Sequence, residues 1–218
     1  MKIKWYGHAA FQLISDKGIK IIIDPYEPGA YNGALSYAKI TDEADIVLTS
    51  HDHADHNYIK SIPGKYTHIN KAGEHDAYGI KIKGIPTFHD NSSGKERGNN
   101  LIFVINADGL SVVHAGDIGH ALDADALKNI GKPDILLLPV GGFFTIDVGE
   151  AVKMMSELKP AITIPMHYKT DKCNFPIVPV EKFTKNQFGV HVLEKAEIEI
   201  TKDSLPEKPE IIVLQHAL

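Results

Sequence analysis

The sequence predicts an α/β protein whose layers enclose buried sheets. Short runs rich in isoleucine and valine recur along the whole chain, and two segments with helical spacing of apolar residues lie among them. No stretch approaches the roughly 18 consecutive apolar residues of a membrane-spanning helix. A chain of 218 residues without a long linker has room for one sizeable core. We therefore expect a single domain over residues 1–218.

The strands are expected in a fixed order along the chain. The opening strands are KIKWY (2–6), FQLIS (11–15) and KIIID (20–24), with a turn at Asp16-Lys17-Gly18 between the last two. The later strands are IVLTS (46–50), IKIKGI (80–85), LIFVI (101–105), LSVVH (110–114), ILLLPV (135–140) and ITIPM (162–166). The pair Asp108-Gly109 predicts a tight hairpin between LIFVI and LSVVH.

Two helices are expected, over residues 120–130 and 148–158. The apolar positions of the first share one face: Leu122, Ala126, Leu127 and Ile130. Gly131 and Pro133 end this helix. The apolar stripe of the second is formed by Val148, Ala151, Val152 and Met155. Asp147 and Glu150 have the spacing of a capping box, and Pro160 stops the helix.

Charge and cysteine content restrict the class of protein. With 28 acidic and 23 basic residues, the net charge of −5 gives no sign of a polyanion binder, so a nucleic-acid partner is not expected. The single cysteine, Cys173, excludes an internal disulfide framework and suits a reducing compartment. MKIKWYGHAAF lacks the apolar core of a signal peptide. We expect a cytoplasmic protein with no membrane partner; no pattern specifies its oligomeric state.

Metal-binding residue types follow the ends of several predicted strands. The hexapeptide HDHADH (51–56) follows IVLTS directly, and the chain holds 12 histidines. Other strands lead to Asp24, His89, Asp117 and His167. Sites in α/β proteins collect where strand ends open into loops, and packing does not explain five such placements. A solvated polar loop is the alternative for the hexapeptide. Imidazole and carboxylate groups suit Zn²⁺, Mn²⁺ or Fe²⁺.

These residues stand in a known order. The pattern His51-x-His53-x-Asp55-His56 is followed by His89 in PTFHD, Asp117 in HAGD and His167 in IPMHY. In this the sequence resembles the metallo-β-lactamase-fold hydrolases, over nearly the whole chain. The resemblance implies a four-layer αββα sandwich with two divalent metal ions, most readily Zn²⁺, in a cleft at its edge.

The resemblance also implies a role for each residue of the pattern. His51, His53 and His89 would hold the first metal, and Asp55, His56 and His167 the second. Asp117 would bridge the two ions, and Asp55 or a metal-bound water is the candidate to protonate the leaving group. A hydroxide shared by two metals is a nucleophile at neutral pH. Asp117 and Asp55 are therefore the expected catalytic residues.

Other residues near the pattern allow two interpretations each. Asp24 could accept an N–H from a ligand histidine or simply end a strand before Pro25. His8 in WYGHAAF could approach the cleft or be a satisfied structural histidine. We expect His114 to be buried and bonded to backbone, and His120 to lie at a helix start. The remaining histidines are expected at the surface: His68, His75, His191 and His216.

Three further features could belong to the mouth of the cleft. The loop Gly141-Gly142-Phe143-Phe144 could form one wall or merely connect a strand to a helix. Lys95 and Arg97, in DNSSGKERGNN (90–100), could meet an anionic substrate or belong to a solvated loop. Cys173 is expected as a free structural thiol.

The resemblance narrows the expected activity. Flavodiiron oxidoreductases of this fold carry Glu where this chain has His53, and add a flavin domain. Nucleases of the fold bring an inserted domain, and secreted β-lactamases a signal peptide. WYGHAAF and the AGD…PMHY pattern look most like small hydrolases related to L-ascorbate-6-phosphate lactonase. We expect hydrolysis of a small-molecule ester or lactone. The alternatives are a phosphodiesterase for a small nucleotide and a non-catalytic metal-binding scaffold.

Overall fold

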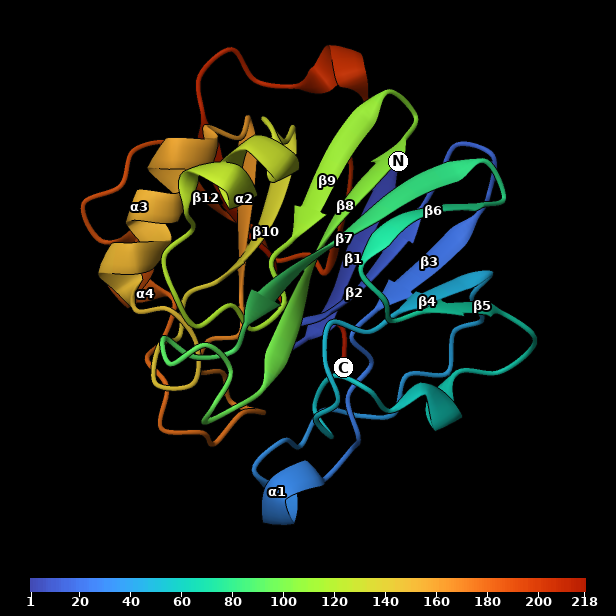
Figure 1. Cartoon of the computed structure of the whole chain (residues 1–218), viewed down its shortest axis with the longest axis horizontal. Helices are drawn as coiled ribbons and strands as arrows, with labels where there is room; N and C mark the ends of the chain where they lie inside the picture. The colour runs from blue at the N-terminus through green and yellow to red at the C-terminus, as the bar shows by residue number, and fades with distance from the viewer.

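Two mixed β-sheets pack face to face in the structure, a computed structural model that describes residues 1–218 (Figure 1). The smaller sheet has the order β13 (Glu197–Glu199), β1 (Lys2–Gly7), β2 (Ala10–Ile14), β3 (Lys20–Ile23), β4 (Ile46–Leu48) and β5 (Thr67–Ile69). The larger sheet has the order β12 (Val190–Val192), β14 (Glu210–Val213), β11 (Ile162–Met166), β10 (Ile135–Pro139), β9 (Leu110–His114), β8 (Asn99–Ala107), β7 (Ile80–Phe88) and β6 (Gly73–Ala77). The predicted α/β class is confirmed.

All nine predicted strands are present, and the predicted hairpin joins β8 to β9. Ala107 pairs with Leu110, which leaves a two-residue connection. Asp108 and Gly109 both have positive φ angles, of 55° and 72°, as a type I′ turn requires. The hydrophobic runs and the turn residues were therefore sufficient to predict the β8–β9 hairpin of the larger sheet.

The core explains why the opening strands are apolar on both faces. In β3, Ile21 and Ile23 belong to the main core between the sheets, whereas Ile22 belongs to a second core on the outer face of the smaller sheet. In β4, Ile46 and Leu48 face the main core and Val47 faces the second. Since successive side chains of a strand point to opposite faces, a continuous apolar run indicates burial on both faces.

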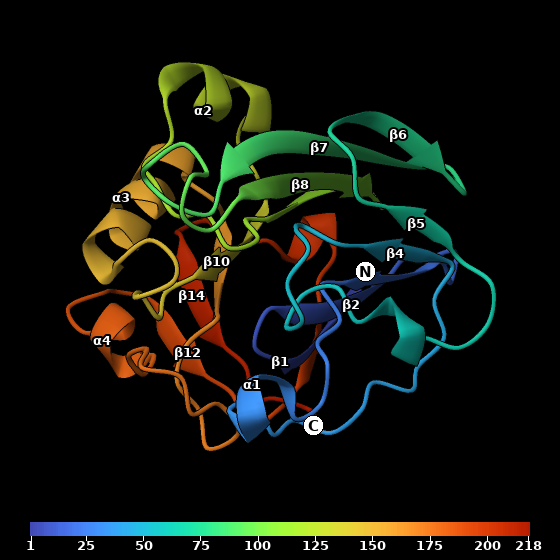
Figure 2. The same cartoon turned by 60° about the horizontal axis from the view of Figure 1, so that its bottom comes forward.

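Three helices cover the outside of the larger sheet: α2 (Ala124–Ile130), α3 (Val148–Leu158) and α4 (Glu181–Thr184) (Figure 2). The predicted capping box of α3 is confirmed, since Asp147 Oδ1 accepts from the Glu150 N–H at 2.8 Å and Glu150 Oε2 accepts from the Asp147 N–H at 2.9 Å. Helix α2 begins later than predicted because the side chain of Asp123 caps it. None of the helices is long and apolar enough to cross a membrane.

The outer layer on the smaller sheet is mostly irregular. Its only α-helical element is α1 (Ala30–Gly33), a four-residue turn in which Tyr31 and Asn32 have left-handed backbone angles. This turn lies apart from the other three helices in both views (Figures 1 and 2). A 3₁₀ turn at Ile59–Ser61 and long loops supply the rest, and a second 3₁₀ turn spans Lys202–Ser204. Buried aromatic side chains from these loops, Tyr26, Tyr37 and Phe175, fill the second core. The expected fourth layer is thus built by loops more than by helices.

The strand directions place all the relevant strand ends at matching edges. Strands β1 and β3 are both antiparallel to β2, and β4 is parallel to β3, so these three run in one direction. Strands β7 and β9 are both antiparallel to β8, and β11 follows β9 and β10 in parallel. The carboxyl ends of three strands therefore lie at one edge of each sheet.

Candidate metal centre

Every residue of the predicted site follows the carboxyl end of one of these strands. In the smaller sheet, His8 follows β1, Asp24 follows β3, and the segment 51–56 follows β4 after two residues. In the larger sheet, His89 follows β7, Asp117 follows β9 and His167 follows β11. The structure thus brings the predicted residues together from six strands of two sheets. Spacing along the sequence alone predicted five of these six placements.

The histidines and aspartates form two adjoining groups. The ligand atoms of His51, His53 and His89 lie within 4.8 Å of one another. A second group, with atoms equally close, consists of His8, Asp55, His56 and His167. These are the two ligand sets that the family resemblance implied, with His8 added to the second.

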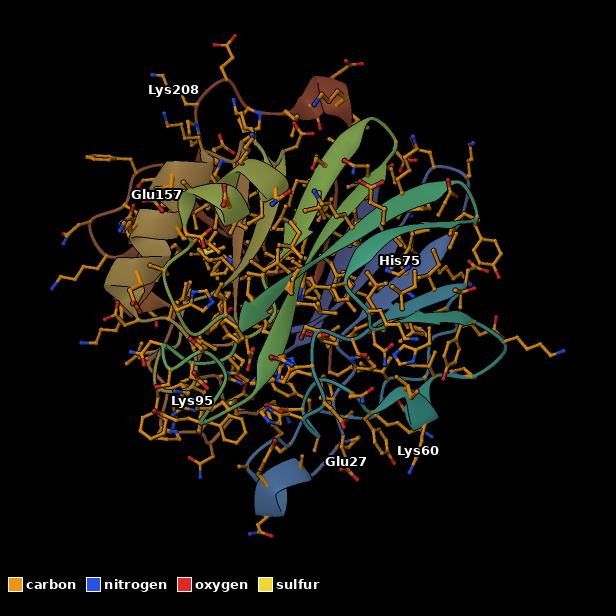
Figure 3. The ribbon with its side chains drawn as sticks, in the orientation of Figure 1. Glu27, Lys60, His75, Lys95, Glu157 and Lys208 are labelled. Atoms are coloured by element: carbon orange, nitrogen blue, oxygen red, sulfur yellow. The ribbon has the colours of Figure 1, made fainter.

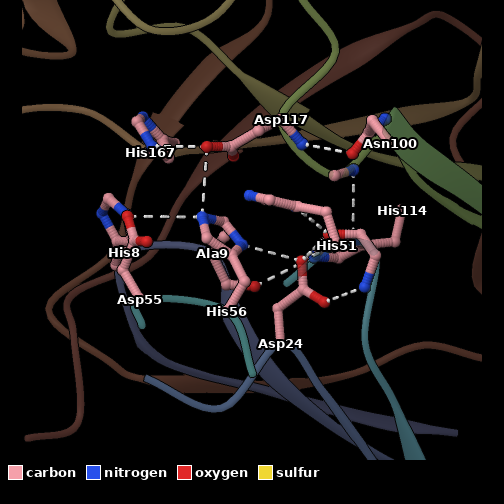
Figure 4. Close-up of polar contacts among 12 residues, drawn as sticks. His8, Ala9, Asp24, His51, Asp55, His56, Asn100, His114, Asp117 and His167 are labelled. Atoms are coloured by element: carbon pink, nitrogen blue, oxygen red, sulfur yellow. Dashed lines mark hydrogen bonds and ion pairs between the residues drawn. The ribbon is translucent and has the colours of Figure 1, made fainter. Parts of the chain in front are cut away.

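Asp117 joins the two groups, and Figure 4 shows it beside His56 and His167 of the second group. Its Oδ2 lies 3.3 Å from Nε2 of His89 in the first group. The same oxygen lies 3.1 Å from Nε2 of His56 and 3.1 Å from Nε2 of His167 in the second. One carboxylate oxygen thus faces three imidazole nitrogens, which is the position expected of a bridging carboxylate.

Unpartnered polar atoms show that these residues fit a metal. Seven of the nine buried side-chain nitrogen and oxygen atoms that hydrogen-bond to no protein group belong to this cluster: His8 Nδ1, His51 Nε2, His56 Nε2, His89 Nδ1, Asp117 Oδ1, His167 Nδ1 and His167 Nε2. An unsatisfied buried polar group costs about 1–3 kcal/mol, so such groups are rarely concentrated at one place without a ligand. Imidazole and carboxylate together suit Zn²⁺, Mn²⁺ or Fe²⁺.

Asp24 fixes the orientation of two histidines. Its Oδ2 accepts from Nδ1 of His56 at 2.9 Å and from the Ser50 hydroxyl at 2.6 Å. Because that hydroxyl gives its only proton to Asp24, it can only accept from Nδ1 of His51, 2.9 Å away. Both imidazoles therefore carry a proton on Nδ1, which leaves Nε2 as the nitrogen that faces the cluster. Of the two interpretations of Asp24, the structure favours the one that orients ligands.

Burial and neighbouring charges determine the protonation of the cluster. Burial lowers the pKa of His51 to about 3, and that of His8 to about 4 with a further contribution from His167. Burial would raise the pKa of Asp117, but His167 and His56 hold it well below its usual value. The same balance, with His56 as the main opposing charge, keeps the pKa of Asp55 well below its usual value. Ionised carboxylates and neutral imidazoles are the forms that bind metal.

His56 is the exception among the histidines. Burial lowers its pKa, but the carboxylates of Asp117 and Asp55 outweigh burial and raise the pKa of His56 well above the usual value. Its proton is therefore held by the surrounding negative charge. His56 would hold a divalent cation through Nε2, and the cation would supply the positive charge that the proton supplies otherwise.

His8 lies inside the cluster and is fully buried. Its Nε2 is 2.9 Å from Oδ2 of Asp55, and its ring centroid is 4.0 Å from that of His167. Of the two interpretations from the sequence, the structure favours the one that brings His8 to the cleft. His114 is buried as predicted, with Nε2 2.9 Å from the Ala9 carbonyl oxygen.

Strained backbone and close packing hold the strand ends in place. His8, Asp24 and His167 have φ angles of 52°, 47° and 50°, a left-handed conformation that costs a non-glycine residue about 1 kcal/mol or more. Beside Asp117, Gly116 has a φ of 57°, and a Cβ there would collide with Oδ1 of Asn100. That oxygen accepts from the Asp117 N–H at 2.9 Å, so Asn100 helps to fix the bridging carboxylate.

A cleft of about 340 Å³ opens onto the cluster. It is lined by Tyr31, His53, Asp55, His89, Arg97, Asp117, Phe144, His167 and Phe175. One aromatic residue of the predicted wall, Phe144, therefore reaches the cleft, and its neighbour Phe143 is 63% exposed. A larger hollow of about 730 Å³ lies on the outer face of β6 and β7, and no residue of the cluster lines it.

The other sequence-based expectations have mixed outcomes. The prediction that His120 starts a helix is wrong: it precedes α2, and its Nε2 accepts from the Phe88 N–H at 3.1 Å. Cys173 is a buried free thiol as predicted. Of the four histidines expected at the surface, His191 is exposed, whereas His68, His75 and His216 are only partly exposed. His68 contacts Thr49 Oγ1 at 2.9 Å.

Sequence reasoning missed four residues of the site. The Tyr31 hydroxyl donates to Oδ1 of Asp55 at 3.0 Å, Phe175 lines the cleft, and Ser50 and Asn100 orient other site residues. Ser50 could have been suspected because it directly precedes the hexapeptide. Tyr31 and Phe175 lie in irregular segments with no periodicity, so no pattern singled them out.

Comparison with known proteins supports the fold and the family. The family model described as β-lactamase superfamily domain matches residues 2–167. The crystal structure of a proposed Zn-dependent hydrolase of the metallo-β-lactamase superfamily from Thermotoga maritima has a TM-score of 0.80 and 34% identity, covering 98% of this chain and 97% of that chain. The fold and the cluster thus define a member of the metallo-β-lactamase superfamily.

Two relatives specify the family further. A protein from Thermoplasma acidophilum is 35% identical over 196 residues, which cover 78% of this chain and 84% of the relative. A protein from Thermococcus onnurineus is 34% identical over 227 residues, which cover 93% of this chain and 96% of the relative. Both are named UPF0173 metal-dependent hydrolase. The chain belongs to the UPF0173 family.

Proposed function

We propose that the protein is a metal-dependent hydrolase that cleaves a small-molecule ester or lactone. The observation that carries the proposal is the pair of ligand groups joined by Asp117 at the floor of an open cleft. The names of the UPF0173 relatives and of the Thermotoga maritima protein agree with a metal-dependent hydrolase.

The assignment of ligands follows the two groups. One cation would be held by His51, His53 and His89. A second would be held by Asp55, His56 and His167. Asp117 would contact both cations. Zinc is our first choice, with manganese or iron as alternatives, because all three accept imidazole and carboxylate ligands. When bound, two such cations acidify water and polarise a carbonyl or phosphoryl oxygen.

The side chains around the cluster have separate tasks in this proposal. Asp117 holds the two halves of the site in register, and Asn100 fixes its backbone. Asp55 is oriented by the Tyr31 hydroxyl on Oδ1 and by His8 on Oδ2. Because its carboxylate is ionised, we assign to it the relay of a proton, which it would accept from the attacking water and pass to the leaving oxygen. Phe144 and Phe175 line the mouth with apolar surface and limit the entry of water.

The dimensions of the cleft favour a small substrate. A volume of about 340 Å³ lies at the lower end of the range for small-molecule sites, which is about 300–1,000 Å³. We place a lactone or another ester first, on the likeness of WYGHAAF and AGD…PMHY to the L-ascorbate-6-phosphate lactonase branch. A small phosphodiester is the second candidate, since the same site would polarise a phosphoryl oxygen. We further propose a cytoplasmic location.

Metal content and hydrolysis test the proposal together. The purified protein is loaded with Zn²⁺, its metal is counted, and hydrolysis of γ-butyrolactone, 4-nitrophenyl acetate and bis(4-nitrophenyl) phosphate is measured for the wild type and for Asp117→Ala. We expect two ions per chain and a loss of at least about 100-fold in kcat/KM for the variant, the size of effect typical of electrostatic stabilisation in a site.

The exposed Asp52, which lies in the same hexapeptide, gives a matched control, and Asp52→Ala should keep both metal and activity. Turnover of the phosphodiester alone would promote the second candidate. Two bound ions without turnover of any substrate would contradict the hydrolase proposal and favour a metal-binding scaffold.

A further inference from the structure

Arg97 is the only arginine of the chain, in which the other 22 of the 23 basic residues are lysines. It lines the cleft together with Tyr31, Phe144 and Phe175. Its guanidinium makes no ion pair and no side-chain hydrogen bond in the structure, and its Cζ lies 5.9 Å from the centre of the Phe144 ring. An arginine beside a cleft with all its side-chain donors free has the capacity to bind a ligand.

The loop that carries Arg97 is built around a buried carboxylate. Asp90 follows His89 directly and is 2% exposed. Its Oδ1 accepts from the N–H groups of Ser92 and Gly94, both at 2.8 Å. Its Oδ2 accepts from the N–H groups of Glu96 at 3.0 Å and Arg97 at 2.8 Å. The backbone of Arg97 is therefore tied to the same strand end that carries a residue of the metal cluster.

We propose that Arg97 is an anion-binding residue of the cleft, and that the substrate carries an oxyanion, a carboxylate or a phosphate, in addition to the bond that is cleaved. This inference rests on the proposed hydrolase function. It makes Asp90 a positioning residue, because Asp90 acts on the substrate only through the loop that presents Arg97.

The chemistry of the guanidinium supports an oxyanion. Its planar fork of N–H donors matches the oxygens of a carboxylate or a phosphate. Its Cζ, 5.9 Å from the centre of the Phe144 ring, is within the range of a cation–π contact. The net charge of the chain is −5, so an unpaired cation at this cleft is not part of a generally basic surface. Lys95, on the same loop, is exposed and does not line the cleft; Figure 3 shows it at the end of the molecule from which α1 also projects.

The remaining walls of the cleft define the rest of the substrate. Phe144 lies 5.9 Å from Cζ of Arg97, and its ring centroid is 5.4 Å from that of Phe175. The Phe175 ring centroid is in turn 5.7 Å from that of His8 in the cluster, so the two rings connect Arg97 to the cluster with apolar surface. A short hydrocarbon segment would contact these rings while its anionic end meets Arg97. The substrate class is therefore a small anionic ester or lactone with an apolar middle.

A matched pair of substrates tests the role of Arg97 in turnover. The zinc-loaded protein is assayed with 4-nitrophenyl hydrogen glutarate, which is anionic, and with methyl 4-nitrophenyl glutarate, its neutral counterpart. We expect Arg97→Gln to lower kcat/KM for the anionic ester by about tenfold or more, mainly through KM, because a charge-assisted hydrogen-bond pair is lost. The neutral ester should change less than about twofold, and Lys95→Gln should leave both unchanged. Equal losses for both esters, or none, would overturn the proposal.

A spectroscopic measurement tests the same site without turnover. Because the chain has one arginine, its Nε–H gives a single side-chain signal in a ¹⁵N-labelled protein, assigned by its loss in Arg97→Gln. Glutarate and inorganic phosphate are titrated in separate arms, with dimethyl glutarate as the neutral control. We expect a saturable shift of this signal with at least one anion and none with the neutral control, and weaker saturation in Asp90→Asn.

The two experiments distinguish a failure of the anion-site proposal from a failure of the hydrolase proposal. A saturable shift without hydrolysis of any substrate would retain the anion site and remove the hydrolase proposal. Hydrolysis without a shift in either arm, and without preference for the anionic ester, would retain the hydrolase and remove the anion site. The anion that saturates the Arg97 signal at the lower concentration, glutarate or phosphate, indicates whether the site prefers a carboxylate or a phosphate.

Discussion

At the scale of single residues, the carboxylate of Asp24 has the widest effect on its neighbours. It accepts hydrogen bonds from Nδ1 of His56 and from the backbone and hydroxyl of Ser50, which in turn orients His51. Its own backbone is left-handed, a conformation that asparagine tolerates almost as well as aspartate. An Asp24→Asn variant therefore preserves the backbone and changes only the hydrogen bonds.

We expect Asp24→Asn to weaken zinc binding by about 10- to 100-fold, the usual effect of removing a carboxylate that orients ligand histidines. Competition with a chromophoric chelator measures the dissociation constant, and circular dichroism checks that the fold is retained. Asp52→Asn, in the exposed part of the same segment, is the control and should bind zinc like the wild type. Equal affinities of Asp24→Asn and the wild type would contradict the orienting role.

Residue types in order along the chain were enough to predict most of the cluster. His51, His53, Asp55, His56, His89, Asp117 and His167 all meet in the structure. Tyr31 and Phe175 could not be predicted, because each reaches the cleft from an irregular segment whose path depends on packing in the second core. Arg97 was noticed as a charge, but its place in the cleft depends on the backbone bonds to Asp90.

At the scale of elements, the loop between β7 and β8 depends on the ionised form of one side chain. Burial would raise the pKa of Asp90, but N–H donors from Arg97, Glu96, Gly94 and Ser92 lower it from 3.8 to about 2. A carboxyl whose pKa is lowered by folding stabilises the folded state above its unfolded pKa. This contribution is lost as the pH falls from about 4 to about 2.

We expect the four amides that bond Asp90 to lose their protection from hydrogen exchange when the pH is lowered from 5 to 2.5. NMR-detected exchange, expressed as protection factors, measures the change residue by residue. Amides in the middle of β8 are the internal control and should stay protected. In Asp90→Asn the loop amides should be weakly protected at both pH values. Protection that is independent of both pH and this substitution would show that other contacts hold the loop.

Element prediction succeeded where burial left a pattern and failed at polar edges. The nine predicted strands are runs of apolar residues, most of them buried on both faces. Of the five missed strands, four lie at the edge of a sheet: β5, β6, β12 and β13. Among them β6 reads GEHDA and β13 reads EIE. The exception is β14, which reads EIIV and lies between β12 and β11. Edge strands carry charges that discourage pairing with other chains, so their sequences resemble loops.

At the scale of the whole molecule, the cluster lies where the two sheets meet. Strands β1, β3 and β4 of the smaller sheet and β7, β9 and β11 of the larger one deliver its side chains. Cations held by residues from both sheets bind only when the sheets are packed together. Metal binding is therefore coupled to global stability.

Removal of metal should lower the melting temperature by at least about 5 °C. A ligand present at 100 times its dissociation constant stabilises the folded state by about 2.7 kcal/mol, and each kcal/mol is worth about 2–4 °C in a domain of this size. Differential scanning calorimetry compares the zinc-loaded protein with the protein treated with a chelator, and two equivalents of Zn²⁺ should restore the first value. Asp117→Asn should respond less, and an unchanged melting temperature would contradict metal binding between the sheets.

The order of the expected ligands along the chain, through the family resemblance, predicted the two sheets and the cleft. It predicted the outer layers less well. The two packed sheets and the position of the cleft agree with the expected sandwich. The sequence of the outer layer on the smaller sheet has no helical spacing of apolar residues. This layer is built mainly from loops around Tyr26 and Tyr37. Such loops are fixed by tertiary contacts, which have no local periodicity.

Strand β13 pairs with a strand that lies far away in the sequence. Residues Glu197–Glu199 pair with Lys2–Lys4 of β1, so β1 gains this neighbour only when a much later segment has been synthesised. Until then that side of β1 presents a row of free N–H and C=O groups, the kind of edge that recruits neighbouring chains. Pairing with β13 thus protects this edge against aggregation.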